Sequence, residues 1–290
     1  MLLSDFIKQA VASLSALYPE SEARSIVTRL LEERLGVQSY THLVEPGREV
    51  PASDIPGLGE DLHRLEAGEP LQYVLGFAEF CGRRFRVDGR VLIPRPETEE
   101  ITLEVCRRAS AMHAPRVLDL CTGSGCIAWS VALEVPGAEV VGVDLSEDAL
   151  AVAAGQFSGM ELAARPPRFV TANVLAPDMD LTALTGWDAA DVIVSNPPYI
   201  LESEKSAMAS NVLDFEPDMA LFVPDGDPLR FYRAVCGIAK RFLSPGGFGA
   251  VEINEALGPD TQALFDAAGF RFTELKTDFR GKTRSLFFCR

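Results

Sequence analysis

The chain has 290 residues, of which 47 % are hydrophobic and 24 % are charged, the balance of a globular protein rather than a disordered or fibrous one. At about 100 to 200 residues per domain, this length suits one large domain and a smaller one. The formal net charge of −15 at pH 7 argues against non-specific DNA binding, because that affinity comes from Lys and Arg side chains that neutralise phosphates.

The cysteine pattern and the N-terminus indicate the compartment. Six cysteines are scattered with no C-x-x-C pair, and the first ten residues, MLLSDFIKQA, lack the basic and apolar regions of a secretory signal. No stretch approaches the ~20 consecutive apolar residues of a membrane helix. We therefore expect a cytoplasmic protein with reduced thiols, no bound metal and no membrane partner, and we take a monomer as the starting hypothesis.

Two groups of basic residues interrupt this acidic chain. They are Arg83, Arg84, Arg86, Arg90 and Arg95, and then Lys276, Arg280, Lys282 and Arg284. Charge runs of this kind usually form a solvated surface. Contact with RNA stays open as the alternative.

The first 75 residues carry a helical pattern. Apolar residues recur at steps of three and four over 2–17 and again over 23–35, which predicts two amphipathic helices. Prolines and glycines break the stretch 38–57, and apolar residues over 58–65 indicate a third helical piece. We predict a small helical domain over 1–75 that helps to dock a protein substrate.

The pattern then changes to strands. Residues 76–96 suit a short hairpin bounded by Asp88-Gly89, which would connect two domains. Within residues 97–290, apolar runs of strand length alternate with helical stretches: VLDL, VVGVD, RFVTAN, DVIVSN and GAVEIN. This order predicts an α/β domain with a Rossmann-like, doubly wound, mostly parallel sheet. The last two runs, 270–275 and 285–288, have no helix between them and predict an antiparallel hairpin at one edge.

A glycine turn follows the first of these strands and opens a helix. Its residues are Cys121, Thr122, Gly123, Ser124 and Gly125. The two glycines let the backbone approach a ligand closely, because no Cβ stands in the way. The next strand ends in Asp144, an acid that could accept hydrogen bonds from both ribose hydroxyls. The turn lacks the G-x-G-x-x-G spacing that cradles a pyrophosphate, so S-adenosylmethionine fits better than a nicotinamide dinucleotide.

A second motif, Asn196-Pro197-Pro198-Tyr199, directly follows the strand DVIVS, at the carboxyl edge where open α/β sheets bind ligands. The prolines remove two donors, so the Pro197 carbonyl and the Asn196 side-chain oxygen can converge on a planar NH2 group. An amide nitrogen is a poor nucleophile and must be aimed along the S–CH3 axis. Acceptors around it would stabilise the developing charge without a strong general base, and Tyr199 would pack over the amide plane.

These motifs together resemble the HemK/PrmC family, the bacterial protein-(glutamine-N5) methyltransferases that modify the GGQ glutamine of class-1 peptide chain release factors. The resemblance covers nearly the whole chain and extends to the segments LIPRPETE (92–99), QYVLG (72–76) and FEP (215–217). It implies a class I methyltransferase fold over 97–290, adenosylmethionine as cofactor and a class-1 release factor as protein substrate.

The resemblance also implies site residues. The cofactor would contact the segment 121–125, Asp144, Asn173, Val174 and Asn196. Asn196, Pro197, Pro198 and Tyr199 would bind the glutamine and serve as the catalytic group. Arg95, Glu97 and Thr98 would line the cleft, although acids at 97–100 equally suit the first turn of a helix.

Three positions depart from the family pattern. Cys121 stands where the family usually has glycine, and Asn173 stands where an acid usually reads the adenine amino group. An asparagine oxygen can still accept from that group, so we expect altered affinity rather than lost binding. Val174 replaces a larger, often aromatic residue, which puts its contact in doubt.

Three alternative functions remain. An N6-adenine nucleic-acid methyltransferase would present the same planar NH2 group, but the net charge and the lack of a target-recognition insertion argue against DNA. A glutamine methyltransferase acting on a ribosomal protein is disfavoured by the segment 96–99 (PETE), which suits a release factor. A non-catalytic docking protein is suggested by Cys121 and Asn173 and disfavoured by the intact Asn-Pro-Pro-Tyr motif.

Overall fold

The computed structural model describes all 290 residues, which form two compact units. The smaller unit contains residues 1–77 and 209–215, and the larger contains 78–208 and 216–290. None of the helices combines the length and the apolar composition that crossing a lipid bilayer requires.

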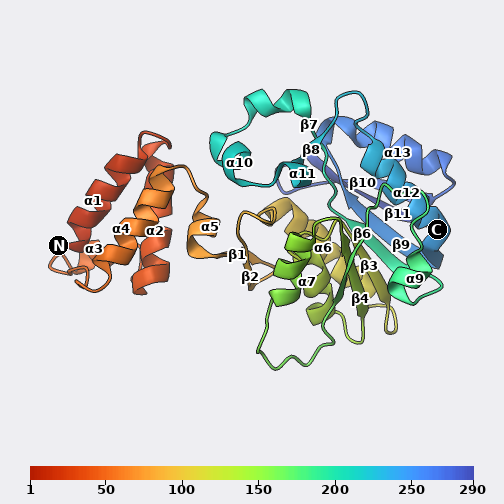
Figure 1. The fold of residues 1–290 in the computed structure, drawn as a ribbon, viewed down its shortest axis with the longest axis horizontal. Helices are drawn as coiled ribbons and strands as arrows, with labels where there is room; N and C mark the ends of the chain where they lie inside the picture. The colour runs from red at the N-terminus through yellow and green to blue at the C-terminus, as the bar shows by residue number, and fades with distance from the viewer. The chain divides into compact units, whose positions relative to one another are not determined.

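The smaller unit is helical (Figure 1). Its helices are α1 (Leu3–Leu14), α2 (Glu20–Leu35), α3 (Thr41–Val44), α4 (Ile55–Glu66), α5 (Leu71–Leu75) and α10 (Ser210–Phe215). The two predicted amphipathic helices and the third helical piece are confirmed as α1, α2 and α4, whose apolar faces form one core. The short helices α3 and α5 were not predicted, because four or five residues show no periodicity.

One arginine links three helices of this unit. Arg34 of α2 donates to Asp61 of α4 at 2.6 Å and to the Val74 carbonyl of α5 at 2.9 Å. Asp61 is only 8 % exposed, so its charge needs this partner. The ion pair therefore fixes α4 and α5 against α2 at the edge of the helical core.

The larger unit alternates strands and helices, and its first strand begins one residue earlier, at Phe77 of the smaller unit. Its strands are β1 (Phe77–Phe80), β2 (Arg83–Arg86), β3 (Arg116–Leu120), β4 (Glu139–Asp144), β5 (Arg168–Thr171), β6 (Ala190–Ser195), β7 (Ile200–Leu201), β8 (Phe222–Val223), β9 (Leu243–Glu252), β10 (Arg271–Thr277) and β11 (Thr283–Cys289). Its helices are α6 (Pro96–Ala109), α7 (Cys126–Glu134), α8 (Glu147–Gly155), α9 (Leu181–Thr185), α11 (Asp218–Leu221), α12 (Arg230–Phe242) and α13 (Gly258–Ala267), with 3-10 turns at Glu202–Ala207 and Glu255–Leu257.

Seven strands form one sheet in the order β10-β11-β9-β6-β3-β4-β5. The strands from β9 to β5 pair in parallel, and β11 and β10 are antiparallel at the edge. The predicted mostly parallel sheet with an antiparallel edge hairpin is therefore confirmed. The predicted connecting hairpin is β1–β2, which turns at Cys81-Gly82 (φ 48° and 69°) and ends just before Asp88-Gly89.

Helices cover both faces of this sheet (Figure 1). On β6, Val192 packs with α6 and α7, whereas Ile193 packs with α12 and α13 on the opposite face. Because successive strand residues point to opposite faces, a continuous apolar run is what a sheet buried on both sides requires. The strands therefore leave only their ends accessible, and the polar residues that follow β3, β4 and β6 gather at the carboxyl edge.

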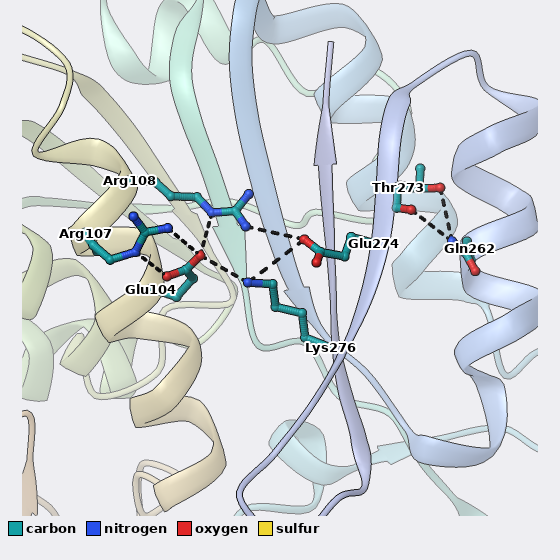
Figure 2. A network of polar contacts seen from close by, with 7 residues as sticks. All are labelled: Glu104, Arg107, Arg108, Gln262, Thr273, Glu274 and Lys276. Atoms are coloured by element: carbon teal, nitrogen blue, oxygen red, sulfur yellow. Dashed lines mark hydrogen bonds and ion pairs between the residues drawn. The ribbon is translucent and has the colours of Figure 1, made fainter.

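A charged network attaches α6 to the edge hairpin (Figure 2). Glu104 accepts hydrogen bonds from Arg107 at 2.6 Å, from Arg108 at 2.8 Å and from Lys276 of β10 at 3.1 Å. Arg108 and Lys276 also approach Glu274. The outermost strand thereby gains contacts that one backbone ladder alone does not provide.

Candidate active site

A cavity of about 350 Å³ opens at the carboxyl edge of the sheet, within the range of small-molecule sites (about 300–1,000 Å³). The residues expected from the sequence that line it are Thr98, Cys121, Thr122, Gly123, Ser124, Asp144, Asn173, Val174, Asn196 and Pro198. Arg95, Glu97, Gly125, Pro197 and Tyr199 lie outside the lining. The structure thus brings together both motifs and the residue that ends β4.

The loop after β3 is held by the acid that ends β4. The Gly123 N–H donates to Asp144 Oδ2 at 2.8 Å, and Asp144 Oδ1 accepts from the Ser146 N–H at 3.0 Å. Gly123 has φ 54°, and a Cβ built on it would meet no atom within 4 Å, so the backbone here faces open space. Each Asp144 oxygen retains a lone pair, which leaves the carboxylate able to accept from ribose hydroxyls.

Gly125 has a different role from Gly123. A Cβ at Gly125 would lie 2.9 Å from the Ala153 Cβ and 3.0 Å from the Phe169 ring, and its φ of 77° lies in the left-handed region. The residue immediately precedes α7. Gly125 is therefore required for close packing of the loop against α8 and β5 rather than for direct contact with a ligand.

Cys121 adopts a backbone conformation that favours glycine. Its φ is 60°, and the left-handed region costs a residue with a Cβ roughly 1–2 kcal/mol. Burial raises the pKa of the Cys121 thiol well above its ordinary value, and Asp144 and Asp119 add to this shift. Cys121 therefore stays a neutral thiol that lines the cavity. Its positive φ also explains why the family that this chain resembles usually has glycine at this position.

Asp119 supports the loop from below. It is fully buried, and its Oδ2 accepts from the Thr122 hydroxyl at 2.5 Å and from the Ala128 N–H at 3.1 Å. Burial raises its pKa to about 7, against the lowering effect of these hydrogen bonds. The carboxyl group thus ties the loop to the first turn of α7.

The residues after β5 line the part of the cavity beyond Asp144. Asn173 Oδ1 accepts from the Leu175 N–H at 3.0 Å, so one of its two lone pairs is used in a local turn and the other stays free. Val174 is 7 % exposed and lines the cavity. An exposed asparagine beside an apolar wall can still read an adenine edge.

These features together fit adenosylmethionine. Gly123 leaves open space at its Cα, Asp144 offers free acceptors, and Val174 contributes an apolar wall beside Asn173. No metal-ligating group of three or more His, Cys, Asp or Glu residues occurs in the chain.

A chain of four polar side chains connects the second motif to two other elements. Asn196 Nδ2 donates to Thr98 Oγ1 at 3.1 Å, and Thr98 Oγ1 donates to Glu252 Oε2 at 2.6 Å. The Tyr199 hydroxyl donates to Glu252 Oε1 at 3.0 Å. Burial, together with the negative charge of Glu252, raises the pKa of Tyr199 well above its ordinary value. Tyr199 is therefore a neutral donor fixed at one end.

The prolines between these residues are both buried. Pro198 lines the cavity and Pro197 does not. Since neither has an N–H group, the stretch after β6 presents carbonyl oxygens without competing donors.

Arg95 and Glu97 lie near the site without lining the cavity. Arg95 pairs with Glu216 at 2.5 Å, and Glu216, which is 4 % exposed, also accepts from the Ile93 N–H at 3.1 Å. This pair ties the segment before α6 to the segment before α11. Glu97 lies in the first turn of α6, as the alternative interpretation of this segment expected.

Sequence reasoning did not select Glu252 as a site residue. Its signal was present in GAVE, where an acid ends an apolar strand just as Asp144 ends VVGVD, but no spacing rule relates Glu252 to Thr98. The remaining unselected residues that line the cavity include Arg90, Leu92, Pro217, Met219 and Arg230.

Comparisons with known proteins identify families and relatives that this chain resembles. Residues 5–76 match the family model described as PrmC N-terminal domain, and residues 101–215 match the model described as Methyltransferase small domain. Among solved structures, the release factor-specific protein-(glutamine-N5) methyltransferase of Alicyclobacillus acidocaldarius is similar over 70 % of this chain and 98 % of its own, at 24 % identity and a TM-score of 0.39.

Two curated relatives match over nearly their whole length. A Bacteroides thetaiotaomicron protein named release factor glutamine methyltransferase is 40 % identical over 286 residues, which are 98 % of each chain. A Flavobacterium psychrophilum protein of the same name is 35 % identical over 289 residues, 99 % of this chain and 98 % of that one. Because such identity extends through both units, this chain belongs to the release factor glutamine methyltransferase family.

Proposed function

We propose that this protein transfers a methyl group from adenosylmethionine to the side-chain amide nitrogen (N5) of the glutamine in the GGQ motif of class-1 peptide chain release factors. The observation that carries the proposal is the hydrogen bond from Asn196 Nδ2 to Thr98. It commits the amide nitrogen of Asn196 to the protein and leaves Oδ1, on the other side of the carboxamide, to accept from a substrate NH2 group.

The protein contributes orientation and charge stabilisation. When bound, adenosylmethionine supplies an electrophilic methyl group on a sulfonium sulfur. Asn196 Oδ1 and the Pro197 carbonyl would accept hydrogen bonds from the two N–H groups of the glutamine amide. These bonds would aim the amide nitrogen at that methyl group. The same acceptors stabilise positive charge as it develops on the nitrogen. Tyr199 would pack against the amide plane. The methylated nitrogen is strongly acidic and would lose one N–H proton to solvent, so no strong base is required.

The cofactor would be held by residues 121–124 of the loop and by Asp144, Asn173 and Val174. Gly123 lets the backbone approach the ligand, Asp144 accepts from the ribose hydroxyls, and Asn173 accepts from the adenine amino group. These roles are supported by the positions of the three residues around one cavity.

A release factor is the protein substrate in this proposal. Both full-length relatives carry that substrate in their names, and PETE at 96–99 follows the family pattern of release-factor enzymes. The six free cysteines suit the reducing cytoplasm in which translation occurs. The protein acts as a monomer, with the smaller unit helping to dock the substrate.

The basic groups favour a protein substrate over nucleic acid. Much of their charge is neutralised by acids, in the pairs Arg83–Glu134, Arg90–Asp88, Arg95–Glu216, Lys276–Glu104, Lys282–Glu255 and Arg284–Asp278. Affinity for nucleic acid comes from basic side chains that are free to neutralise phosphates and so release the counterions of the nucleic acid. A nucleic-acid methyltransferase is therefore the weaker candidate.

The direct test is intact-mass analysis of a recombinant class-1 release factor after incubation with this protein and adenosylmethionine, with fragmentation to locate the added mass. One methyl group on the GGQ glutamine is the expected result. Transfer to a ribosomal protein or to adenine instead would refute the proposed substrate. Calorimetry that detects no adenosylmethionine binding at millimolar ligand would favour a non-catalytic docking protein.

A further inference from the structure

Glu252 is a buried acid without a positively charged partner within hydrogen-bonding distance. It ends β9 and is 2 % exposed. Its two oxygens each accept one hydroxyl hydrogen bond, from Thr98 at 2.6 Å and from Tyr199 at 3.0 Å. A buried carboxylate is costly, so its retention between these two residues requires an explanation.

The hydroxyl group of Thr98 links the donor or acceptor state of Glu252 to the orientation of Asn196. A hydroxyl has one proton to donate and lone pairs with which to accept. An ionised Glu252 can only accept, so it takes the single Thr98 proton. Thr98 Oγ1 can then act only as an acceptor toward Asn196, and the Asn196 carboxamide must present its NH2 group there.

The oxygen and the NH2 group of an asparagine carboxamide have nearly the same size and shape but opposite hydrogen-bonding character. If the Asn196 carboxamide turned over, its Oδ1 would face Thr98 and its NH2 group would face the substrate. That orientation would place a donor against the donor NH2 group of a glutamine. Only one of the two orientations is productive for transfer to an amide nitrogen.

We propose that Glu252 is a positioning residue for methyl transfer: its carboxylate sets the proton direction of the Thr98 hydroxyl and thereby holds the Asn196 carboxamide in the productive orientation. Through its second oxygen it also anchors the Tyr199 hydroxyl, so one carboxylate orients both ends of the Asn-Pro-Pro-Tyr motif. This inference rests on the proposed function of the site.

Protonation of Glu252 would weaken this control. A protonated Glu252 could donate to Thr98, and the Thr98 proton would then be free to bind Asn196 Oδ1. The pKa of Glu252 is raised to about 7, mainly by burial. Hydrogen bonds from Thr98 and Tyr199 and the charge of Arg284 of β11 oppose this shift, whereas the charge of Glu97 of α6 adds to it. Burial and the charge of Glu252 also raise the pKa of Tyr232 of α12. The turnover rate should therefore fall as the pH drops through about 7.

The test compares Glu252→Gln with wild type in release-factor methylation under saturating adenosylmethionine. Glutamine keeps the shape of the side chain but can donate to Thr98, as the protonated acid does. We expect kcat to fall about 10- to 100-fold, while KM for the release factor and Kd for adenosylmethionine stay within about twofold. The variant should also lose the fall in kcat below about pH 7 that the wild-type enzyme shows.

Asp191→Asn provides the matched control. Asp191 lies at the amino end of β6, the strand that the motif follows, and there it accepts from the Arg116 N–H and from the Ser244 hydroxyl at 3.0 Å each. The Asp191→Asn substitution removes an acid from β6 and leaves the residues that line the cavity unchanged. Its kcat and pH profile should match those of wild type.

Each outcome decides the inference. If Glu252→Gln retains kcat within about twofold of an active wild-type enzyme, the positioning role is wrong while the proposed function stands. If wild type itself methylates no release factor, the proposed function fails and the inference with it. If Glu252→Gln does not fold, Thr98→Val and Thr98→Ser decide: the inference requires that only serine preserves kcat, and equal rates would overturn it.

Discussion

Hydrogen-bonding capacity decides the chemistry of Asn196. One side of its carboxamide is bound to Thr98, and the residue lines the cavity together with Pro198. The hydrogen bond from the Gly123 N–H to Asp144 Oδ2 holds the cofactor loop without the help of Asn196. Orientation of the acceptor amide and binding of adenosylmethionine should therefore be separable at the level of single residues.

Asn196→Ala should lower the rate of methyl transfer by at least about 100-fold, because the orienting acceptor is lost. The Kd for adenosylmethionine should change by less than about threefold, since the loop and Asp144 are untouched. Single-turnover kinetics and isothermal calorimetry on the same preparation measure the two effects. A near-normal rate would refute the role of Asn196.

Gly123 is the position where a small change should affect the cofactor most directly. Gly123→Ala forces a Cβ into the left-handed region and into the open cavity, so we expect a loss of about 1–2 kcal/mol of unfolding free energy and at least about a tenfold rise in Kd for adenosylmethionine. Gly159→Ala is the matched control, because Gly159 has φ 81° and equally open surroundings but lies outside the cavity lining. Equal effects of both variants on Kd would contradict this assignment.

At the scale of elements, the edge hairpin depends on side chains from two helices. Figure 2 shows Glu104 of α6 among three cations, and Gln262 of α13 donating to the Thr273 carbonyl of β10 at 3.0 Å. An outermost strand has one unpaired edge. These contacts from α6 and α13 hold β10 in place where hydrogen bonds from a second neighbouring strand are missing.

Glu104→Gln should lower the free energy of unfolding at pH 7 by about 0.2–1 kcal/mol for each exposed ion pair lost. Hydrogen bonds from Arg107, Arg108 and Lys276 hold the pKa of Glu104 well below its ordinary value. A lowered carboxyl pKa adds stability that is present above the unfolded value of about 4.3 and is lost as the pH falls through the folded value. The difference between variant and wild type should therefore shrink below about pH 4.

Urea unfolding of Glu104→Gln and wild type at several pH values measures this difference. Glu274→Gln serves as the control, because Glu274 is 58 % exposed and its nearest cation is 3.5 Å away. The control should change stability much less. A Glu104→Gln effect that is independent of pH would show that the charge of Glu104 is not what stabilises the hairpin.

At the scale of the whole molecule, the candidate active site belongs to one unit. Every residue that lines the cavity lies within 78–208 or 216–290. The smaller unit has its own apolar core and adds no side chain to this lining. Cofactor binding should therefore depend on the larger unit alone, whereas we propose that the smaller unit helps to dock the protein substrate.

A fragment containing residues 78–290, which is the larger unit with the segment 209–215 added, should bind adenosylmethionine within about threefold of the full chain, because it contains the complete cavity lining. Its methylation of the release factor should be weaker, with the main effect on KM. Circular dichroism and thermal melting establish that the fragment is folded. A folded fragment that cannot bind the cofactor would contradict the independence of the two units.

The sequence by itself determined the longer helices, the strands of the main sheet and the two motifs. Apolar runs of strand length, a glycine turn and Asn-Pro-Pro-Tyr are local features, and the carboxyl ends of parallel strands necessarily meet at one edge of a sheet. This is why the order of residues along the chain was enough to assign Gly123, Asp144 and Asn196 to one site. The helical face periodicity of α1 and α2 is equally local.

Only the tertiary structure decided how the second motif is oriented. Thr98 and Glu252 are 154 positions apart, and Arg95 and Glu216 are 121 positions apart. The structure also assigned residues 209–215 to the smaller unit. A side-chain hydrogen bond requires the distance between donor and acceptor to be correct to within a few tenths of an ångström. That distance depends on how the helices pack on the sheet and not on any periodicity along the chain.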